Sequence, residues 1–286
     1  VYKRQQIRVE KNYRLSQYLE SMGLSDLALK IREEGIAAPE EAFNSFKTWT
    51  EYINRLLGAI LGLLIVAMTA YSFTFRKEKP ILFYGSLVAL VLVVFQGWIG
   101  SVVVSTNLLP GMVTFHMALA ILLIGLLIYV FYRASDIGTN TPRRMFKPKR
   151  VEYLLVIAMV LFFTQVAVGT QVREAIDLVA ANMGLEARDQ WIGQLEGAYY
   201  FHRTFSLALI AISGYLLVLL RKSEDVRVRS WADLLIGLVA LEVVLGIVMA
   251  YMGVPPWAQP LHLLVSVLII GLQFWLFLYA RKTSNA

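Results

Sequence analysis

The stretch GMVTFHMALAILLIGLLIYVFYR, residues 111–133, places one histidine near the start of an almost wholly apolar run, residues 112–132. An α-helix needs about 20 apolar residues to cross the hydrocarbon core of a bilayer. Six more runs meet this criterion: residues 52–75, 80–104, 151–171, 199–220, 231–252 and 260–280. We therefore predict an all-α polytopic membrane protein with seven transmembrane helices in this chain.

The composition agrees with a membrane protein and excludes several kinds of site. The chain is 58% hydrophobic and 16% charged, with a mean hydropathy of +0.61. It has no cysteine, which excludes disulfides, zinc–thiolate sites, iron–sulfur clusters and covalently attached c-type heme. The net charge of +7 lies largely in predicted cytoplasmic loops, so we expect membrane lipid around the protein and no nucleic-acid partner.

Basic residues are concentrated in alternate loops, which predicts the topology. The basic positions are Arg76, Lys77, Lys79, Arg133, Arg143, Arg144, Lys147, Lys149, Arg150, Arg221, Lys222, Arg227, Arg229, Arg281 and Lys282. The positive-inside rule places these loops and the C-terminus in the cytoplasm, and we expect a bacterial cytoplasmic (inner) membrane. Polar residues 1–47 then form an extracytoplasmic segment. We therefore expect that a transmembrane helix preceded Val1 or, alternatively, that a signal peptide was cleaved.

The chain also contains an internal duplication. Shifts of 146 or 148 residues superpose Gln96 on Glu242, Gly100 on Gly246, His116 on His262, and Asn54 on His202. We predict two pseudo-symmetric four-helix bundles, four plus four, with the first helix missing. The predicted parts are an incomplete first bundle at 48–133, a cytoplasmic linker at 134–150 and a second bundle at 151–286.

The three histidines lie near the outer ends of three predicted helices. Polar side chains inside a bilayer are costly and usually functional. Imidazoles from two facing helices suit a six-coordinate heme iron, so we predict that His202 and His262 bind one heme. His116 would bind a second iron, with Asn54 as a weak or absent opposite ligand. The alternative for each is a polar side chain packed at a helix end.

Other polar residues lie at the same predicted end. Glu51 shares a helical face with Asn54, three residues away, where a carboxylate is suited to an acid–base or cation-stabilising role. An interfacial carboxylate helped by the helix dipole fits the sequence slightly better. Arg55, Arg173 and Arg203 are candidates to bind heme propionates or to anchor their helices at the interface.

Five stretches resemble the heme A synthase family. They are TWTEYINRLLGA (48–59), QGWIGSVVVSTNLLPGMVTFHMALA (96–120), GTQVREAIDLVA (169–180), YYFHRTFS (199–206) and QPLHLL (259–264). The resemblance runs from about Thr48 to the C-terminus. The chain departs from the family pattern at Asn54, where most members have histidine, and in lacking the cysteine pair of many members.

The resemblance implies an eight-helix protein that oxidises the ring D methyl group of heme O to a formyl group, giving heme A for cytochrome oxidase. It implies that His202 and His262 bind heme b, His116 binds heme O, and Glu51 is the catalytic carboxylate. Heme O synthase, a farnesyltransferase, and the oxidase assembly machinery are the implied partners, whereas the electron donor is not identified.

Two other function classes fit parts of the sequence. A non-catalytic di-heme cytochrome b explains His202 and His262 equally well, but it explains poorly the Asn54 position and the one-sided Glu51. A heme-free transporter or sensor would use the histidines as proton relays.

Overall fold

The structure is a computed structural model that describes residues 2–21, 25, 28–29, 31–32, 45–106, 111–135 and 145–284. All regular secondary structure in these residues is helical, which confirms the all-α prediction. Arg143 and Arg144 of the predicted linker lie outside the described residues. The chain divides into two compact units: Val1–Thr74 with Ser86–Leu119, and Phe75–Gly85 with Ala120–Ala286.

Seven helices in the described residues are long and apolar enough to cross a membrane, as the sequence predicted. They are α3 (Ser45–Ser72), α4 (Pro80–Ser105), α5 (Met112–Ala134), α7 (Pro148–Met183), α8 (Gly197–Arg221), α9 (Val226–Tyr251) and α10 (Ala258–Ser284). The shorter elements are α1 (Tyr2–Ser21), η1 (Phe73–Phe75) and η2 (Leu185–Gln194). The chain is therefore an integral membrane protein.

The membrane helices expose large apolar side chains. Leu63 of α3 is 69% exposed and Val94 of α4 is 67% exposed. Contiguous apolar surface of this kind is unfavourable in water, whereas lipid hydrocarbon accepts it when the helix satisfies its own backbone hydrogen bonds.

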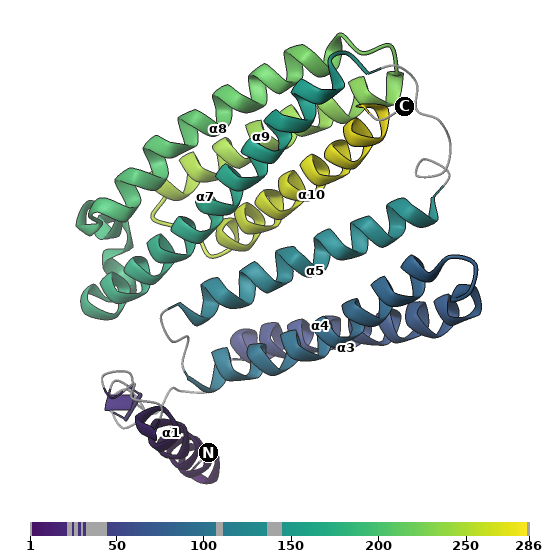
Figure 1. Cartoon of the computed structure of the whole chain (residues 1–286). Coiled ribbons are helices and arrows are strands. Elements are labelled where there is room, and N and C mark those ends of the chain that lie inside the picture. Colours follow the sequence, from purple (N-terminus) through teal and green to yellow (C-terminus); the bar gives the residue numbers. More distant parts are fainter. Residues whose placement is uncertain are drawn as a thin grey trace. The chain divides into compact units, whose positions relative to one another are not determined.

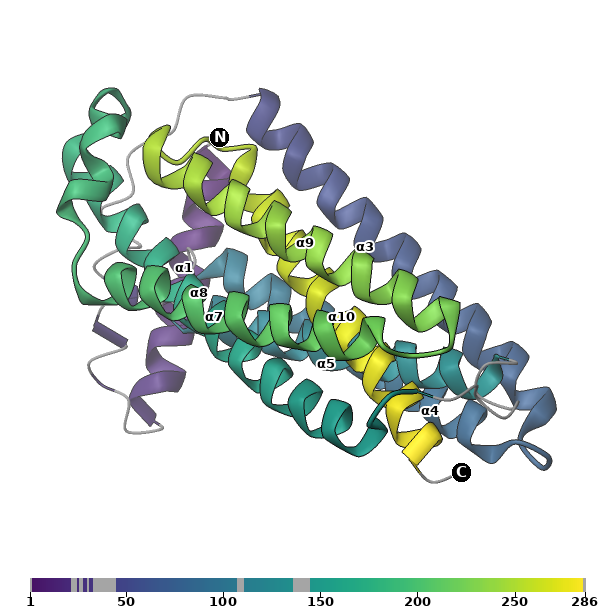
Figure 2. The same ribbon diagram turned by 90° about the horizontal axis from the view of Figure 1, so that it is seen from above.

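Helices α7 to α10 form a four-helix bundle within the second unit (Figures 1 and 2). Each packs against two of the others: α7 and α9 both contact α8 and α10. Leu155, Leu216, Leu235 and Leu276, one from each helix, are almost completely buried between them. This antiparallel order brings the start of α8 and the start of α10 to the same end of the bundle.

Asp225 fixes the opposite end of this bundle. Its Oδ1 accepts a hydrogen bond from the backbone N–H of Arg227 at 3.0 Å and so caps α9. Its Oδ2 accepts from Arg227 Nη2 at 2.9 Å and from the Tyr279 hydroxyl of α10. Burial raises the pKa of the Asp225 carboxyl, but the hydrogen bonds from Arg227 and Tyr279 and the Arg227 charge outweigh it and lower the pKa to about 2.

α7 continues twelve residues past the predicted end at 171. Apolar positions in the extension recur at helical spacing and pack against the α7–α8 connection. Ile176, Trp191, Leu195 and Val254 form a buried cluster there, and the Trp191 indole N–H donates to the Gly184 carbonyl at 3.2 Å. This cluster covers the end of the bundle at which α8 and α10 begin.

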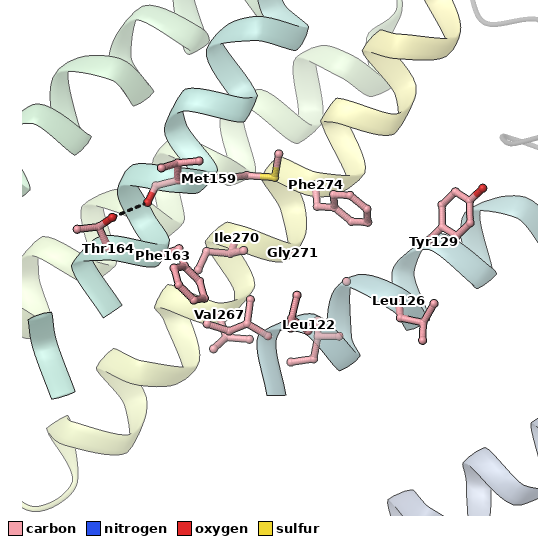
Figure 3. Close-up of a pocket in the computed structure, with 14 residues that line it drawn as sticks. Leu122, Leu126, Tyr129, Met159, Phe163, Thr164, Val267, Ile270, Gly271 and Phe274 are labelled. Carbon is pink, nitrogen blue, oxygen red and sulfur yellow. Dashed lines mark hydrogen bonds between the residues drawn. The ribbon is translucent and has the colours of Figure 1, made fainter. Parts of the chain in front are cut away.

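A pocket of about 530 Å³ lies in the second unit between α5, α7 and α10 (Figure 3). Its walls are almost wholly apolar and include Leu122 and Leu126 of α5, Phe163 of α7, and Val267 and Phe274 of α10. None of the three histidines lines it.

Candidate heme-binding site

Each histidine lies in the second turn of its helix. His116 is the fifth residue of α5, His202 the sixth of α8 and His262 the fifth of α10. All three are partly buried. A helix rises about 1.5 Å per residue, so the three imidazoles lie at a similar depth below the ends of their helices.

His202 and His262 face each other across the second bundle. Their ring centroids are 6.3 Å apart and the rings are inclined at 68°. A metal–imidazole nitrogen bond is about 2 Å long and the ring centroid lies about 1 Å further on, so two rings on opposite sides of one metal have centroids about 6 Å apart. The observed separation is therefore compatible with both rings binding one iron between them.

The polar atoms of these rings also fit a heme. The Nδ1 atoms of His116, His202 and His262 are buried and make no hydrogen bond in the described part of the chain. Buried polar groups normally have partners, so each ring has hydrogen-bonding capacity that the described chain does not use, which is compatible with a ligand-binding role. With their centroid separation, His202 and His262 fit axial ligation of a heme.

Gln165 of α7 supports His202. Its Nε2 donates to the His202 carbonyl oxygen at 3.0 Å and lies 3.4 Å from His202 Nε2. In the first unit, Gln96 of α4 does the same for His116: its Nε2 donates to the His116 carbonyl at 2.8 Å and lies 3.5 Å from His116 Nε2.

Glu242 of α9 supports His262 differently. Its Oε1 lies 3.3 Å from His262 Nδ1 and accepts a hydrogen bond from the Ser266 hydroxyl of α10. The contact between Oε1 and Nδ1 does not meet the geometry of a hydrogen bond. In the described chain, His262 Nδ1 and Glu242 Oε2 therefore have no hydrogen bond.

One turn after each of Gln96, Gln165 and Glu242, a glycine lies against the imidazole ring of the supported histidine. A Cβ at Gly100 would be 3.3 Å from His116 Cε1, one at Gly169 would be 3.2 Å from His202 Cε1, and one at Gly246 would be 3.7 Å from His262 Cε1. The arrangement of glutamine or glutamate, then glycine four residues later, then histidine on the next helix therefore occurs in α4–α5, α7–α8 and α9–α10.

The sequence analysis missed Gln165 and Gly169. Their signal was the spacing Gln-x-x-x-Gly, already present at Gln96 and Gly100. It was obscured because 37 residues separate Gln165 from His202, whereas 20 separate Gln96 from His116. The additional residues lie in the longer end of α7 and in the connection that contains η2.

The other candidate residues lie on exposed surfaces. Glu51, Asn54 and Arg55 are on exposed turns of α3, and Arg55 forms an ion pair with Glu51 on the same helix. Arg173 is likewise paired with Asp177 of α7, and Arg203 is exposed on α8. Exposed ion pairs contribute little energy, so either arginine can exchange its partner for a ligand at small cost.

Several known proteins have similar sequences, and the similarity covers most of this chain. It is 24% identical to heme A synthase of Rickettsia rickettsii (strain Sheila Smith), over 81% of this chain and 74% of that protein. It is 25% identical to heme A synthase of Rickettsia prowazekii (strain Madrid E), over 82% and 75%. For heme A synthase of Methylobacterium sp. (strain 4-46) the identity is 26%, over 80% and 69%.

No solved structure matches the chain. The family model described as cytochrome oxidase assembly protein (COX15-CtaA) matches residues 33–274. This match and the relatives confirm the family resemblance drawn from the sequence. The chain belongs to the COX15-CtaA family of cytochrome oxidase assembly proteins.

Proposed function

We propose that this protein is a heme A synthase, an oxidoreductase of heme A biosynthesis for cytochrome oxidase. In the proposed reaction, the ring D methyl group of heme O becomes the formyl group of heme A. The observation that carries the proposal is the opposed pair His202 and His262, 6.3 Å apart at their centroids, in a chain of this family.

The two bundles have different roles in this proposal. His202 and His262 hold heme b, which supplies electron transfer when bound. His116 holds the iron of the substrate heme O. Asn54 on α3 is the residue that the repeat aligns with His202. The histidines and arginines named above lie toward the outer face of the bacterial inner membrane, and the C-terminus is cytoplasmic. Heme O synthase supplies the substrate.

Conversion of a methyl to a formyl group removes four electrons and four protons and adds the oxygen of one water. With dioxygen as the electron acceptor, methyl plus dioxygen gives formyl plus water, so the atoms and electrons balance. Glu51 is proposed for the acid–base or cation-stabilising role that oxidation of this methyl group requires. In this proposal, Arg55 leaves its ion pair with Glu51 to bind a heme propionate.

The test is to co-express the full-length protein with a heme O-producing farnesyltransferase and to extract the hemes. We expect heme A from the unsubstituted protein, and bound heme with no heme A from Glu51→Ala. Glu78→Ala removes an exposed carboxylate just beyond the other end of α3 and should form heme A normally.

Three results would count against parts of the proposal. Normal heme A from Glu51→Ala removes Glu51 from the mechanism. Heme O without heme A in the unsubstituted protein indicates the non-catalytic cytochrome b instead. A heme-free preparation from heme-replete cells excludes both heme functions.

A further inference from the structure

Three residues, Gln96, Gln165 and Glu242, support a histidine on the next helix, and of these only Glu242 has a carboxylate. Gln96 and Gln165 use an amide N–H to hold a histidine carbonyl, and a carboxylate has no N–H to donate. Glu242 is instead directed at the imidazole, with Oε1 at 3.3 Å from His262 Nδ1. A carboxyl group in a membrane helix is costly, and a neutral amide fills this position in the other two helix pairs.

The carboxylate is held in place from α10. Ser266 lies one turn after His262 on the same helical face, and its hydroxyl donates to Glu242 Oε1. The Glu242 side chain is 14% exposed and that of His262 is 20% exposed, so little water screens the contact. A small rotation of the imidazole would complete a hydrogen bond from Nδ1–H to Oε1.

We propose that Glu242 is the positioning residue for His262 and sets the reduction potential of the heme bound by His202 and His262, an inference that rests on the proposed heme site. An acceptor at Nδ1 places the ring proton there and leaves the Nε2 lone pair for iron. It also makes the imidazole a stronger electron donor, which favours the oxidised iron. The repeat mate of His262, His116, has an amide instead, so Glu242 distinguishes the electron-transfer heme from the substrate heme.

The experiment measures the midpoint potential of the low-spin heme in the full-length protein at one fixed pH. That heme is identified as the signal lost in both His202→Ala and His262→Ala. We expect Glu242→Gln to lower the ratio of oxidised to reduced heme at least tenfold at a given potential, which is a rise of about 59 mV for a one-electron couple. As a control, Glu152→Gln changes another carboxylate of this bundle, one contacted by Ser284 at 3.1 Å, and should leave the potential unchanged.

Ser266→Ala gives an independent second measurement. It removes the hydrogen bond that Ser266 donates to Glu242 and leaves the carboxylate to act on His262 alone. We therefore expect a smaller shift in the opposite direction, toward lower potential. If Glu242→Gln does not fold by circular dichroism, Ser266→Ala decides, and an unshifted potential overturns the inference. A folded Glu242→Gln protein that loses the low-spin signal supports the positioning role.

Failure of the inference differs from failure of the proposed heme site. Unsubstituted protein without a low-spin heme that depends on His202 and His262 ends both. A low-spin heme whose potential is the same in the unsubstituted, Glu242→Gln and Ser266→Ala proteins ends the Glu242 assignment alone.

Discussion

Gln165 donates a hydrogen bond from its side-chain amide to the backbone carbonyl oxygen of His202, at 3.0 Å. The bond joins α7 to α8 at the level of the proposed iron ligand. It therefore fixes the position of the His202 backbone along the bundle axis, whatever rotamer the imidazole adopts.

Gln165→Met should weaken the proposed heme site. The substitution keeps the side-chain length but removes a hydrogen bond worth about 1 kcal/mol, so we expect heme affinity to fall about fivefold. Heme titration followed by absorption measures this. Gln194→Met, at an exposed position of η2, is the matched control. An unchanged affinity in Gln165→Met would show that the hydrogen bond does not position His202.

Gly169→Ala and Gly246→Ala should differ in their effects. A Cβ at Gly169 would lie 3.2 Å from His202 Cε1, so the ring must shift by a few tenths of an ångström, whereas 3.7 Å at Gly246 is an ordinary contact with His262. Both changes favour the helix by about 1 kcal/mol, so a loss in one alone is a site effect. We expect an altered low-spin resonance and lower heme content only in Gly169→Ala. Equal behaviour of the two variants contradicts this prediction.

His262→Ala and His116→Ala should separate the two proposed heme sites. Loss of His262 removes one of two opposed axial ligands, and we expect the low-spin absorption and resonance signals to disappear. His116 belongs to the helix pair α4–α5, outside the second bundle, so His116→Ala should keep those signals and lose bound heme O. Persistence of the low-spin signal in His262→Ala would refute its assignment as a ligand.

Asp225→Asn should destabilise the protein in a pH-dependent way. The folded-state pKa of Asp225 is lowered from 3.8 to about 2. Its charged form therefore stabilises the fold fully above about pH 4, and this contribution is lost as the pH falls through 2. The contribution is about 2 kcal/mol at pH 7, and asparagine keeps the helix cap.

Thermal unfolding in detergent at several pH values measures the Asp225 contribution. The destabilisation by Asp225→Asn should shrink as the pH is lowered from 4 to 2. Asp233→Asn removes the exposed partner of Arg221 and should change stability little at any pH. A constant difference between Asp225→Asn and the unsubstituted protein down to pH 2 would contradict the lowered pKa.

The transmembrane helices could be predicted from local runs of apolar residues, and the histidines could be related to one another through the internal repeat. A run of apolar residues fixes a membrane helix by its length, and the repeat aligns His116 with His262. The end of α7 was predicted too early because Arg173, Glu174 and Asp177 end the apolar run, although Ile176 continues the buried face. Periodicity, and not mean hydropathy, marks where that helix ends.

Side-chain supports across helices were harder to predict. The repeat aligned Glu242 with Gln96, but the contact of Glu242 with His262 depends on the rotation of α9 against α10, which no local pattern fixes. The ion pairs of Arg55 and Arg173 with neighbours on their own helices also depend on side-chain choice among several partners. The domain boundaries at residues 48, 134 and 151 stay predictions. So do the roles of Glu51, Asn54, the three histidines, and Arg55, Arg173 and Arg203.

Each histidine of the second bundle takes its supporting side chain and its glycine from the helix directly before it. The hairpins α7–α8 and α9–α10 therefore each contain one half-site that is complete in itself. A heme held by His202 and His262 would cross-link the two hairpins. Heme insertion would then be an assembly step of the bundle, because it joins the half-site of α7–α8 to that of α9–α10.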